Sequence, residues 1–413
     1  MIAQNPGNFW PVLVLALSLS LFSACDQKIK AVGDPTQTQG ITDTEILLGN
    51  SSPQSGHAQH LGTHYLRGAM VFFEDLNSRG GILGRKIRVI SYDDQYDPSH
   101  CVLNTQKLIG QDKVFALFNY VGTPTTIKIS PIVEESKIPL VGVFSGADVL
   151  RNPVKKYIFN IRSSYSMEVD QTVMHCVDDL GFKKLAVFYQ NDAFGIDVLK
   201  GIETALKRYK LKPVVTESYE RGTLNVERAA KSILTSGADA VIMAGLYSPC
   251  SKFVRLMKDA GSSMIFFSSS FVGAEEFAKE LGEKDSTGVI ISQVVPPPSF
   301  DVLSTVRNYK KLSKRYFPES QPDIVALEGF VNAKVIAEGL KRAGKDLSRE
   351  KFVQALESLH DYSGGIGNPI DFSESNHSGL SYVFFTRIKN GDLVFFDDWQ
   401  EIKNEMALVP RDI

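Results

Sequence analysis

Cysteine, tryptophan and net charge are all scarce in this chain of 413 residues. It has 4 Cys and 2 Trp, and its 45 Lys and Arg nearly balance 47 Asp and Glu, for a net charge of −2. Without an excess of one sign of charge, nothing favours a nucleic acid or a strongly acidic partner. So few cysteines cannot staple a fold of this length, and we expect a hydrophobic core to hold it together. The length suits two compact domains.

Signatures of common catalytic sites are also missing. The chain has no phosphate-binding loop and no Cys-x-x-Cys pair. The segment GVFSGA around Ser145 does not match the Gly-x-Ser-x-Gly pattern of a nucleophile elbow. Asp93 and Asp94 end a predicted strand, where neighbouring side chains point to opposite faces and cannot act as a pair. We therefore expect neither enzymatic activity nor a cofactor.

One apolar run stands out at the N-terminus. Phe9–Phe22 (FWPVLVLALSLSLF) is too short to span a bilayer and is followed by two small residues and Cys25, which predicts a signal peptide over residues 1–24. The ending LFSAC resembles a bacterial lipobox in which Cys25 is lipidated, although Phe22 replaces the usual Leu and no Lys or Arg precedes the run. A plain signal peptide with an incidental cysteine is the alternative. Residues 25–44 are polar and predict a flexible tether.

From Glu45 onward, strand-like and helix-like segments alternate. Short apolar runs such as VFALFNY (114–120) predict parallel strands, and longer periodic segments such as Leu61–Ser78 predict crossover helices. Two such series predict an α/β fold of two doubly wound parallel-sheet lobes. Three consecutive prolines in QVVPPPSF (293–300) fit a segment that crosses between lobes. The segment YVFFTRIKNGDLVFF (382–396) predicts a hairpin with Asn-Gly at its turn.

Five segments between about residues 45 and 400 follow one another in a distinctive order. They are SGHAQHLGTHYLRGAMVFFEDLNSRGGILGRKIRVISYDDQYDP, VFALFNYVGTPTT, IPLVGVFSGADVLR, AVFYQNDAFG and ALEGFVNAKVIAEGLKRAG. Together they resemble the substrate-binding proteins of ABC importers, of the Leu/Ile/Val-binding type with a type I periplasmic binding fold. The resemblance implies two lobes joined by a three-strand hinge near 160–164, 293–298 and 379–383. The expected lobes are 45–162 plus 298–380, and 163–297 plus 381–413.

Ligands of open α/β sheets bind beyond the carboxyl ends of the strands, so the segments that follow strands supply the candidates. Gly122 and Thr123 lead into a predicted helix, whose N-terminus accepts a carboxylate. The resemblance implies that Thr123 and the segment 144–146 hold the carboxylate and amino ends of the ligand, and that Phe194 packs on it. The full set of candidate ligand-binding residues is Ser55, Gly122, Thr123, Phe144, Ser145, Gly146, Phe194, Tyr247 and Ser270.

Ser270 departs from the family pattern. Amino-acid binders of the family carry an acidic residue there, which pairs with the α-ammonium of the ligand. A buried ammonium without that partner is costly, so we expect an amide, an aromatic acid or another carboxylate at least as readily as leucine. Asp192 or Glu328 are alternative sources of the missing charge, which keeps amino acids open.

The expected role is a monomeric, lipid-anchored receptor in the periplasm or on the cell surface, which delivers a small-molecule ligand to an ABC transporter permease. A sensor lipoprotein that reports ligand to a membrane signalling protein is the alternative.

Three of the 7 histidines, His57, His60 and His64, gather in one short stretch. Because His60 and His64 are four residues apart, they share one face of a helix, a spacing also seen in metal sites. A tetrahedral zinc site needs three or four converging ligands, and the stretch contains no Cys, Asp or Glu. We therefore favour a loop that touches the solute, with His57 or Gln59 donating a hydrogen bond, and expect no metal.

Overall fold

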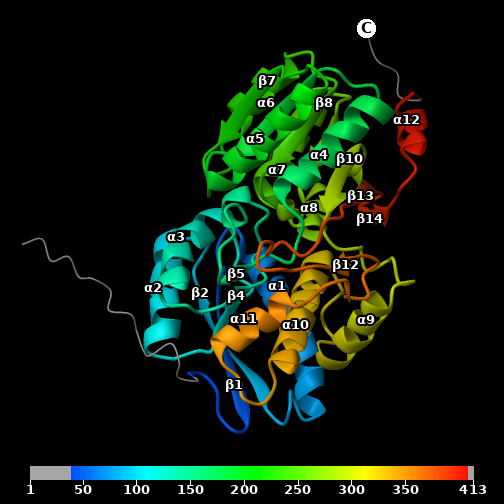
Figure 1. The fold of residues 1–413 in the computed structure, drawn as a ribbon. Helices are drawn as coiled ribbons and strands as arrows, with labels where there is room; N and C mark the ends of the chain where they lie inside the picture. The colour runs from blue at the N-terminus through cyan, green and yellow to red at the C-terminus, as the bar shows by residue number, and fades with distance from the viewer. Residues whose placement is uncertain (1–38, 408–413) are drawn as a thin grey trace, which may run out of the picture.

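The computed structural model describes residues 39–407, which fold into two lobes, one above the other in Figure 1. In this part of the chain, the lower lobe is built on a five-stranded parallel sheet in the order β2-β1-β3-β4-β5. β3, β4 and β5 are short apolar runs, whereas β1 and β2 also carry polar residues. The strands are β1 (Glu45–Ser52), β2 (Lys86–Asp93), β3 (Ala116–Phe118), β4 (Leu140–Val141) and β5 (Ile158–Phe159).

The upper lobe contains a mixed sheet, which among the described residues has seven strands in the order β14-β13-β10-β9-β8-β6-β7. The predicted hairpin is confirmed: β13 and β14 pair antiparallel, and Asn390 and Gly391 adopt the positive φ angles of 54° and 84° that its turn requires. The upper sheet is mixed because β13 also pairs antiparallel with β10. The strands are β6 (Leu185–Gln190), β7 (Val215–Tyr219), β8 (Ala240–Ala244), β9 (Ile265–Ser268), β10 (Val289–Gln293), β13 (Phe384–Lys389) and β14 (Asp392–Phe395).

Helices cover both sheets. The lower lobe has α1 (Gln59–Ser78), α2 (Pro98–Gly110), α3 (Thr123–Glu135), α9 (Ser304–Tyr316), α10 (Ile324–Ala343) and α11 (Arg349–Glu357), with η1 (Asp148–Leu150) and the short pair β11 (Tyr362–Ser363) and β12 (Pro369–Ile370). The upper lobe has α4 (Tyr165–Met174), the π-helical η2 (His175–Asp179), α5 (Ala193–Arg208), α6 (Glu227–Leu234), α7 (Tyr247–Asp259), η3 (Ser270–Val272), α8 (Ala274–Ser286) and α12 (Trp399–Ala407).

Helix α10 is buried along most of its length and packs closely against α1. Two glycines permit this approach. A Cβ on Gly68 would lie 1.7 Å from the carbonyl oxygen of Ala326, and a Cβ on Gly329 would lie 2.0 Å from that of Tyr65. The N-terminus of α10 is thereby fixed at the edge of the lower lobe that faces the upper one (Figure 1).

Three segments cross between the lobes. The first follows β5, and its backbone oxygens at Asn160 and Ile161 accept hydrogen bonds of 2.8 Å from Gly379 and Leu380 in the third crossing segment. The second contains the proline run after β10. The expected fold class, two α/β lobes joined by a three-strand hinge, is confirmed. The residue limits of the lobes, 45–162 plus 298–380 and 163–297 plus 381–413, stay a prediction.

The predicted signal peptide (1–24), Cys25 and the tether as far as residue 38 lie outside the described residues. The last part of the tether packs on the lower lobe, because the carbonyls of Gly40 and Thr44 each accept a hydrogen bond of 2.7 Å, from Leu47 and Lys86. The limits of the tether, residues 25–44, stay a prediction. No helix between residues 39 and 407 combines the length and apolar character needed to cross a membrane.

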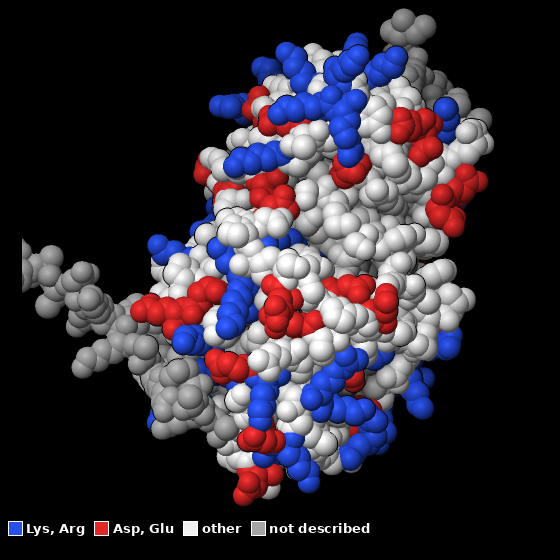
Figure 2. Space-filling view, viewed as in Figure 1, with Lys and Arg blue, Asp and Glu red and all other residues white. Residues whose placement is uncertain are grey.

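Charged side chains of both signs are mixed on the surface, as the net charge of −2 leads us to expect. Lys and Arg are interspersed with Asp and Glu over the face drawn in Figure 2.

Cys101, Cys176 and Cys250 are buried and free, so the chain's described portion contains no disulfide. Burial raises the pKa of each of the three thiols, which keeps them protonated.

Candidate functional site

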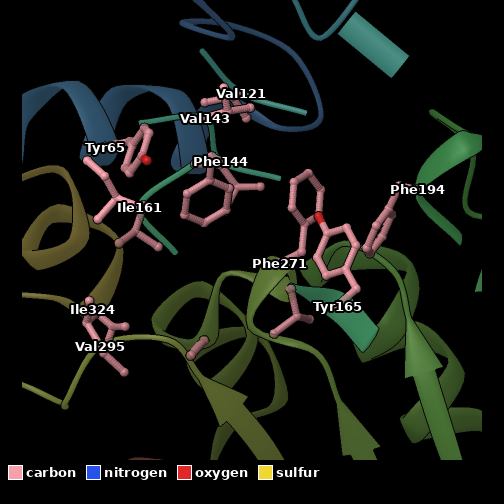
Figure 3. Packing of buried hydrophobic residues seen from close by; sticks show 14 of the residues in the cluster. Tyr65, Val121, Val143, Phe144, Ile161, Tyr165, Phe194, Phe271, Val295 and Ile324 are labelled. Carbon is pink, nitrogen blue, oxygen red and sulfur yellow. The ribbon is translucent and has the colours of Figure 1, made fainter. Parts of the chain in front are cut away.

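The carboxyl ends of the two sheets face each other, and a cluster of aromatic side chains joins them (Figure 3). Phe271, in η3 of the upper lobe, lies at its centre, with ring centroids 5.5 Å from Phe144 and 6.2 Å from Tyr96 of the lower lobe. Phe194 and Tyr165 of the upper lobe complete the cluster at 4.4 and 6.3 Å from Phe271. All five rings are buried. We call this region, with the polar groups around it, the interlobe site.

A pair of hydroxyls borders the aromatic cluster on the lower lobe. Thr123 Oγ1 and Ser145 Oγ lie 2.7 Å apart, and both residues are buried. Thr123 begins α3, whose first N–H groups have no partner within the helix and carry positive partial charge. Gly122 precedes it with a φ of 104°, and a Cβ there would lie 2.2 Å from the ring of Tyr96. The structure thus brings together the predicted residues Gly122, Thr123 and Ser145 at an end suited to a carboxylate.

Gly146 connects the segment next to the Thr123 and Ser145 hydroxyls to the upper lobe. Its carbonyl accepts a hydrogen bond of 2.8 Å from the backbone N–H of Tyr165. A Cβ on Gly146 would lie only 2.5 Å from Cδ1 of Tyr165. The buried hydroxyls of Tyr165 and Tyr96 have no hydrogen-bond partner in residues 39–407. Because burial raises the pKa of both phenols, they remain protonated and can donate.

A buried guanidinium connects the two lobes. Arg162, on the first crossing segment, is 1% exposed. Its Nη2 donates to Ser270 Oγ of the upper lobe, and its Nε lies 3.4 Å from Glu328 Oε1 of the lower lobe. The guanidinium carbon lies 4.3 Å from the ring centroid of Phe144. Burial raises the pKa of Glu328 to about 7, against the opposite effect of Arg162.

Ser270, expected at the position where amino-acid binders of the family carry an acidic group, is held by a carboxylate from α4. Glu168 accepts hydrogen bonds from the Ser270 backbone N–H at 2.8 Å and from its hydroxyl at 2.9 Å, and another from Ser292 Oγ at 2.5 Å. Both Glu168 and Arg162 were missed in the sequence, as were Tyr96, Tyr165 and Phe271. An aromatic residue amid the hydroxyls of SSSFVG was the available signal for Phe271.

Two predicted site residues contact other groups. Ser55 Oγ donates to Asp93 Oδ2 at 2.6 Å, which ties the first loop to the end of β2. Tyr247 begins α7, and its ring centroid lies 5.9 Å from that of His60. A Cβ on Gly273 would contact both Tyr247 and Leu61, so Tyr247 lies where α7 meets α1. Their roles in ligand binding stay predictions.

The three histidines of the first loop and helix have separate partners. His60 and His64 stack with centroids 3.8 Å apart, but His60 Nδ1 lies 3.7 Å from Glu276 and His64 Nδ1 lies 3.0 Å from Asp323. His57 is exposed and packs edge-on against Tyr96. Nowhere in residues 39–407 do three or more His, Cys, Asp or Glu side chains gather closely enough to hold a metal ion.

Comparisons with known proteins agree with the two-lobed fold. A solved structure of a possible leucine/isoleucine/valine-binding protein from Rhodopirellula baltica matches with a TM-score of 0.83 and 30% identity, and covers 89% of this chain and 99% of that one. The "Leu/Ile/Val-binding protein homolog 7" of Brucella abortus is 23% identical over 369 residues, which is 85% of this chain and 90% of the relative.

An "Amino acid binding protein" of Pseudomonas aeruginosa is 28% identical over 243 residues, 58% of this chain and 64% of the relative, slightly less than two thirds of its length. The sequence profile of periplasmic binding proteins matches residues 45–392, most of the chain. Proteins of such a family bind solutes outside the cytoplasm and are generally not enzymes. The chain belongs to the periplasmic binding protein family.

Proposed function

We propose that the protein is a lipid-anchored solute receptor that captures a small polar ligand between its lobes and delivers it to the permease of an ABC transporter. The ligand is an amino acid, an amide or a carboxylate. Lipid on Cys25 would hold this monomeric receptor at a membrane in the periplasm or on the cell surface. The observation that carries the proposal is the buried hydroxyl pair of Thr123 and Ser145 at the start of α3, beside Gly146, whose carbonyl is bonded to Tyr165 of the other lobe.

Capture follows from the position of the interlobe site. The ligand carboxylate would accept hydrogen bonds from Thr123 and the N-terminus of α3, while Phe194 and Phe271 pack against the body of the ligand. Because these groups belong to different lobes, the ligand binds best when the lobes are together and shifts the population toward that arrangement. The permease would then recognise the closed form.

A thermal-shift experiment tests the proposal. The mature protein is heated with amino acids, amides, and aliphatic and aromatic carboxylates, and a true ligand raises the unfolding temperature because it binds only the folded state. At a concentration about 100 times its Kd, the ligand adds about 2.7 kcal/mol to the free energy of unfolding.

Thr123→Val should abolish the shift produced by that ligand. The control is Thr105→Val, which removes another buried hydroxyl of the lower lobe, bonded to Cys101 and Tyr120 away from the interlobe site. This control should lower stability and keep the response. If no compound of the panel raised the unfolding temperature, or if the shift were unchanged in Thr123→Val, the proposal would be contradicted.

A further inference from the structure

The interlobe site has a cation where the family resemblance places an anion. Arg162 donates to Ser270, the residue at the expected position of the acidic group, and its side chain is 1% exposed. Its Nε and Nη1 have no hydrogen-bond partner in the described part of the chain, although guanidinium N–H groups are strong donors. A buried guanidinium with two N–H groups left unbonded, between the facing strand ends, is a site for a hydrogen-bond acceptor.

The carboxylates that could pair with an ammonium are already engaged. Glu168 accepts the three hydrogen bonds from Ser270 and Ser292. Asp192 caps α5 by accepting from the backbone of Phe194 and Gly195, and it also accepts from Gln190 at 2.6 Å. Both act as structural acceptors.

Glu328, the remaining candidate, lies in ion-pair distance of Arg162 at 3.4 Å. Burial raises its pKa to about 7, so near neutral pH it is partly protonated. It therefore neutralises only part of the positive charge of Arg162. A second buried guanidinium, Arg151, donates to the backbone carbonyls of Ser145 and Arg162 and adds positive charge close by. An ammonium brought to this place would meet two cations.

We propose that Arg162 determines ligand specificity: its positive charge favours binding of an acidic solute and disfavours ligands that carry an α-ammonium. The ligand class is therefore small carboxylates without an amino group on the α-carbon, with an apolar body held among Phe144, Phe194 and Phe271. The proposal rests on the proposed function, since it assumes that the interlobe site captures a solute.

The discrimination is expected to be large. With the ligand carboxylate held at Thr123 and the start of α3, an α-ammonium placed beside Arg162 and Arg151 would lose its hydration without gaining a partner, whereas the second carboxylate of a diacid would accept a charge-assisted hydrogen bond from Arg162 Nε or Nη1. Hydrogen bonds to charged groups contribute enough to make at least about tenfold differences in Kd.

Matched pairs of ligands test the proposal. Titration calorimetry of the wild-type protein compares each acid with its 2-amino counterpart: 4-methylpentanoate with leucine, 3-phenylpropanoate with phenylalanine, and succinate with aspartate. We expect at least one acid to bind about tenfold or more tightly than its amino acid. If amino acids bind more tightly than the acids, the specificity proposal fails while the proposed function stands. If no compound of either kind binds, both fail.

A charge-balanced variant assigns the preference to Arg162. R162M/E328Q removes the guanidinium together with its ion-pair partner, so no uncompensated carboxylate is left by the pair. It should lose the preference for the acid. The control R349M removes another buried arginine, which donates to the backbone of Val114 and Phe115 at the opposite end of the lower sheet. R349M should be less stable and keep the preference; a preference that survives in R162M/E328Q would overturn the assignment.

Discussion

At the residue scale, Gly146 sets how closely the two lobes approach beside the interlobe site. A Cβ there would lie 2.5 Å from both the backbone nitrogen and Cδ1 of Tyr165, so the backbone itself must move. We expect Gly146→Ala to lower the free energy of unfolding by about 1–3 kcal/mol, as overpacked sites do, and to weaken ligand binding. Chemical denaturation and titration measure the two effects. The control is Gly364→Ala, whose Cβ would meet only side-chain atoms, of Ile370 at 3.1 Å and of Ile366 at 3.5 Å, and should cost less.

The residues of the site differ in how well the sequence predicts them. Thr123 and Ser145 were predicted because the pattern of a strand followed by a turn is local, and the carboxyl ends of neighbouring parallel strands share an edge. Arg162 and Glu168 were missed because each reaches Ser270 across more than a hundred residues, 108 and 102 respectively. Their role depends on how the lobes pack, which local periodicity does not encode. The resemblance marked Ser270 as a departure from the expected acidic residue, but the sequence did not identify Arg162 and Glu168 as the partners of Ser270.

At the element scale, the N-terminus of α10 depends on one buried carboxylate. Asp323 caps the helix by accepting from the backbone of Ala326 at 2.7 Å, and its other oxygen pairs with Arg67 and lies 3.0 Å from His64 of α1. Burial alone would raise the pKa of Asp323, but His64 and Arg67 outweigh it and hold the pKa below its usual value. The cap therefore also connects α10 to α1.

Removing this cap should be costly. We expect Asp323→Ala to lower the free energy of unfolding by about 3 kcal/mol or more, because it removes a cap and leaves Arg67 without its partner. Asp323→Asn, which keeps an acceptor for Ala326, should cost less. The control is Asp97→Ala, which removes a cap of α2 bonded only to Ser99 and His100 and should cost about 1 kcal/mol. Equal losses for Asp323→Ala and Asp97→Ala in urea denaturation would contradict the role of the ion pair.

Helices and hairpins were easier to predict than strand lengths. The periodic segment Leu61–Ser78 lies within α1, and the Asn-Gly turn marked the hairpin correctly, since both signals are local. The apolar run IPLVGVF forms a strand only at Leu140–Val141, because Gly142 has a φ of 76° and the chain then turns into the site. The pairing of this hairpin with β10 was not predicted, since the hairpin belongs to a segment that returns through the hinge.

At the scale of the whole molecule, several contacts away from the interlobe site also join the lobes. The backbone N–H of Ile324, at the start of α10, donates to Glu275 of α8 at 2.6 Å. His60 of α1 lies 3.7 Å from Glu276 of α8, and at the border of the interlobe site Arg221 donates to the backbone of Tyr96 at 3.4 Å. These contacts depend on the lobes being together, so they belong to the arrangement that the ligand would stabilise.

The contact made by Glu275 should make stability depend on pH. Burial, and then the charge of Asp323, raises the pKa of Glu275 to about 8, and its Oε2 is buried without a partner within residues 39–407. The native state therefore holds a proton that the unfolded state releases above its ordinary pKa of 4.5. Because the native state binds more protons in this window, the contribution of Glu275 falls as pH rises from about 4.5 to 8.

Glu275→Gln keeps an acceptor for Ile324 and cannot ionise, so it should gain stability over the wild type as pH rises from 6 to 8, by roughly 1–3 kcal/mol at pH 8. Chemical denaturation of both proteins at each pH measures the difference. His60, whose pKa burial lowers to about 4, stays neutral throughout. Glu283→Gln, an exposed change on the same helix, is the control and should show no such trend. A constant difference between wild type and Glu275→Gln from pH 6 to 8 would show that Glu275 does not hold a proton in the closed molecule.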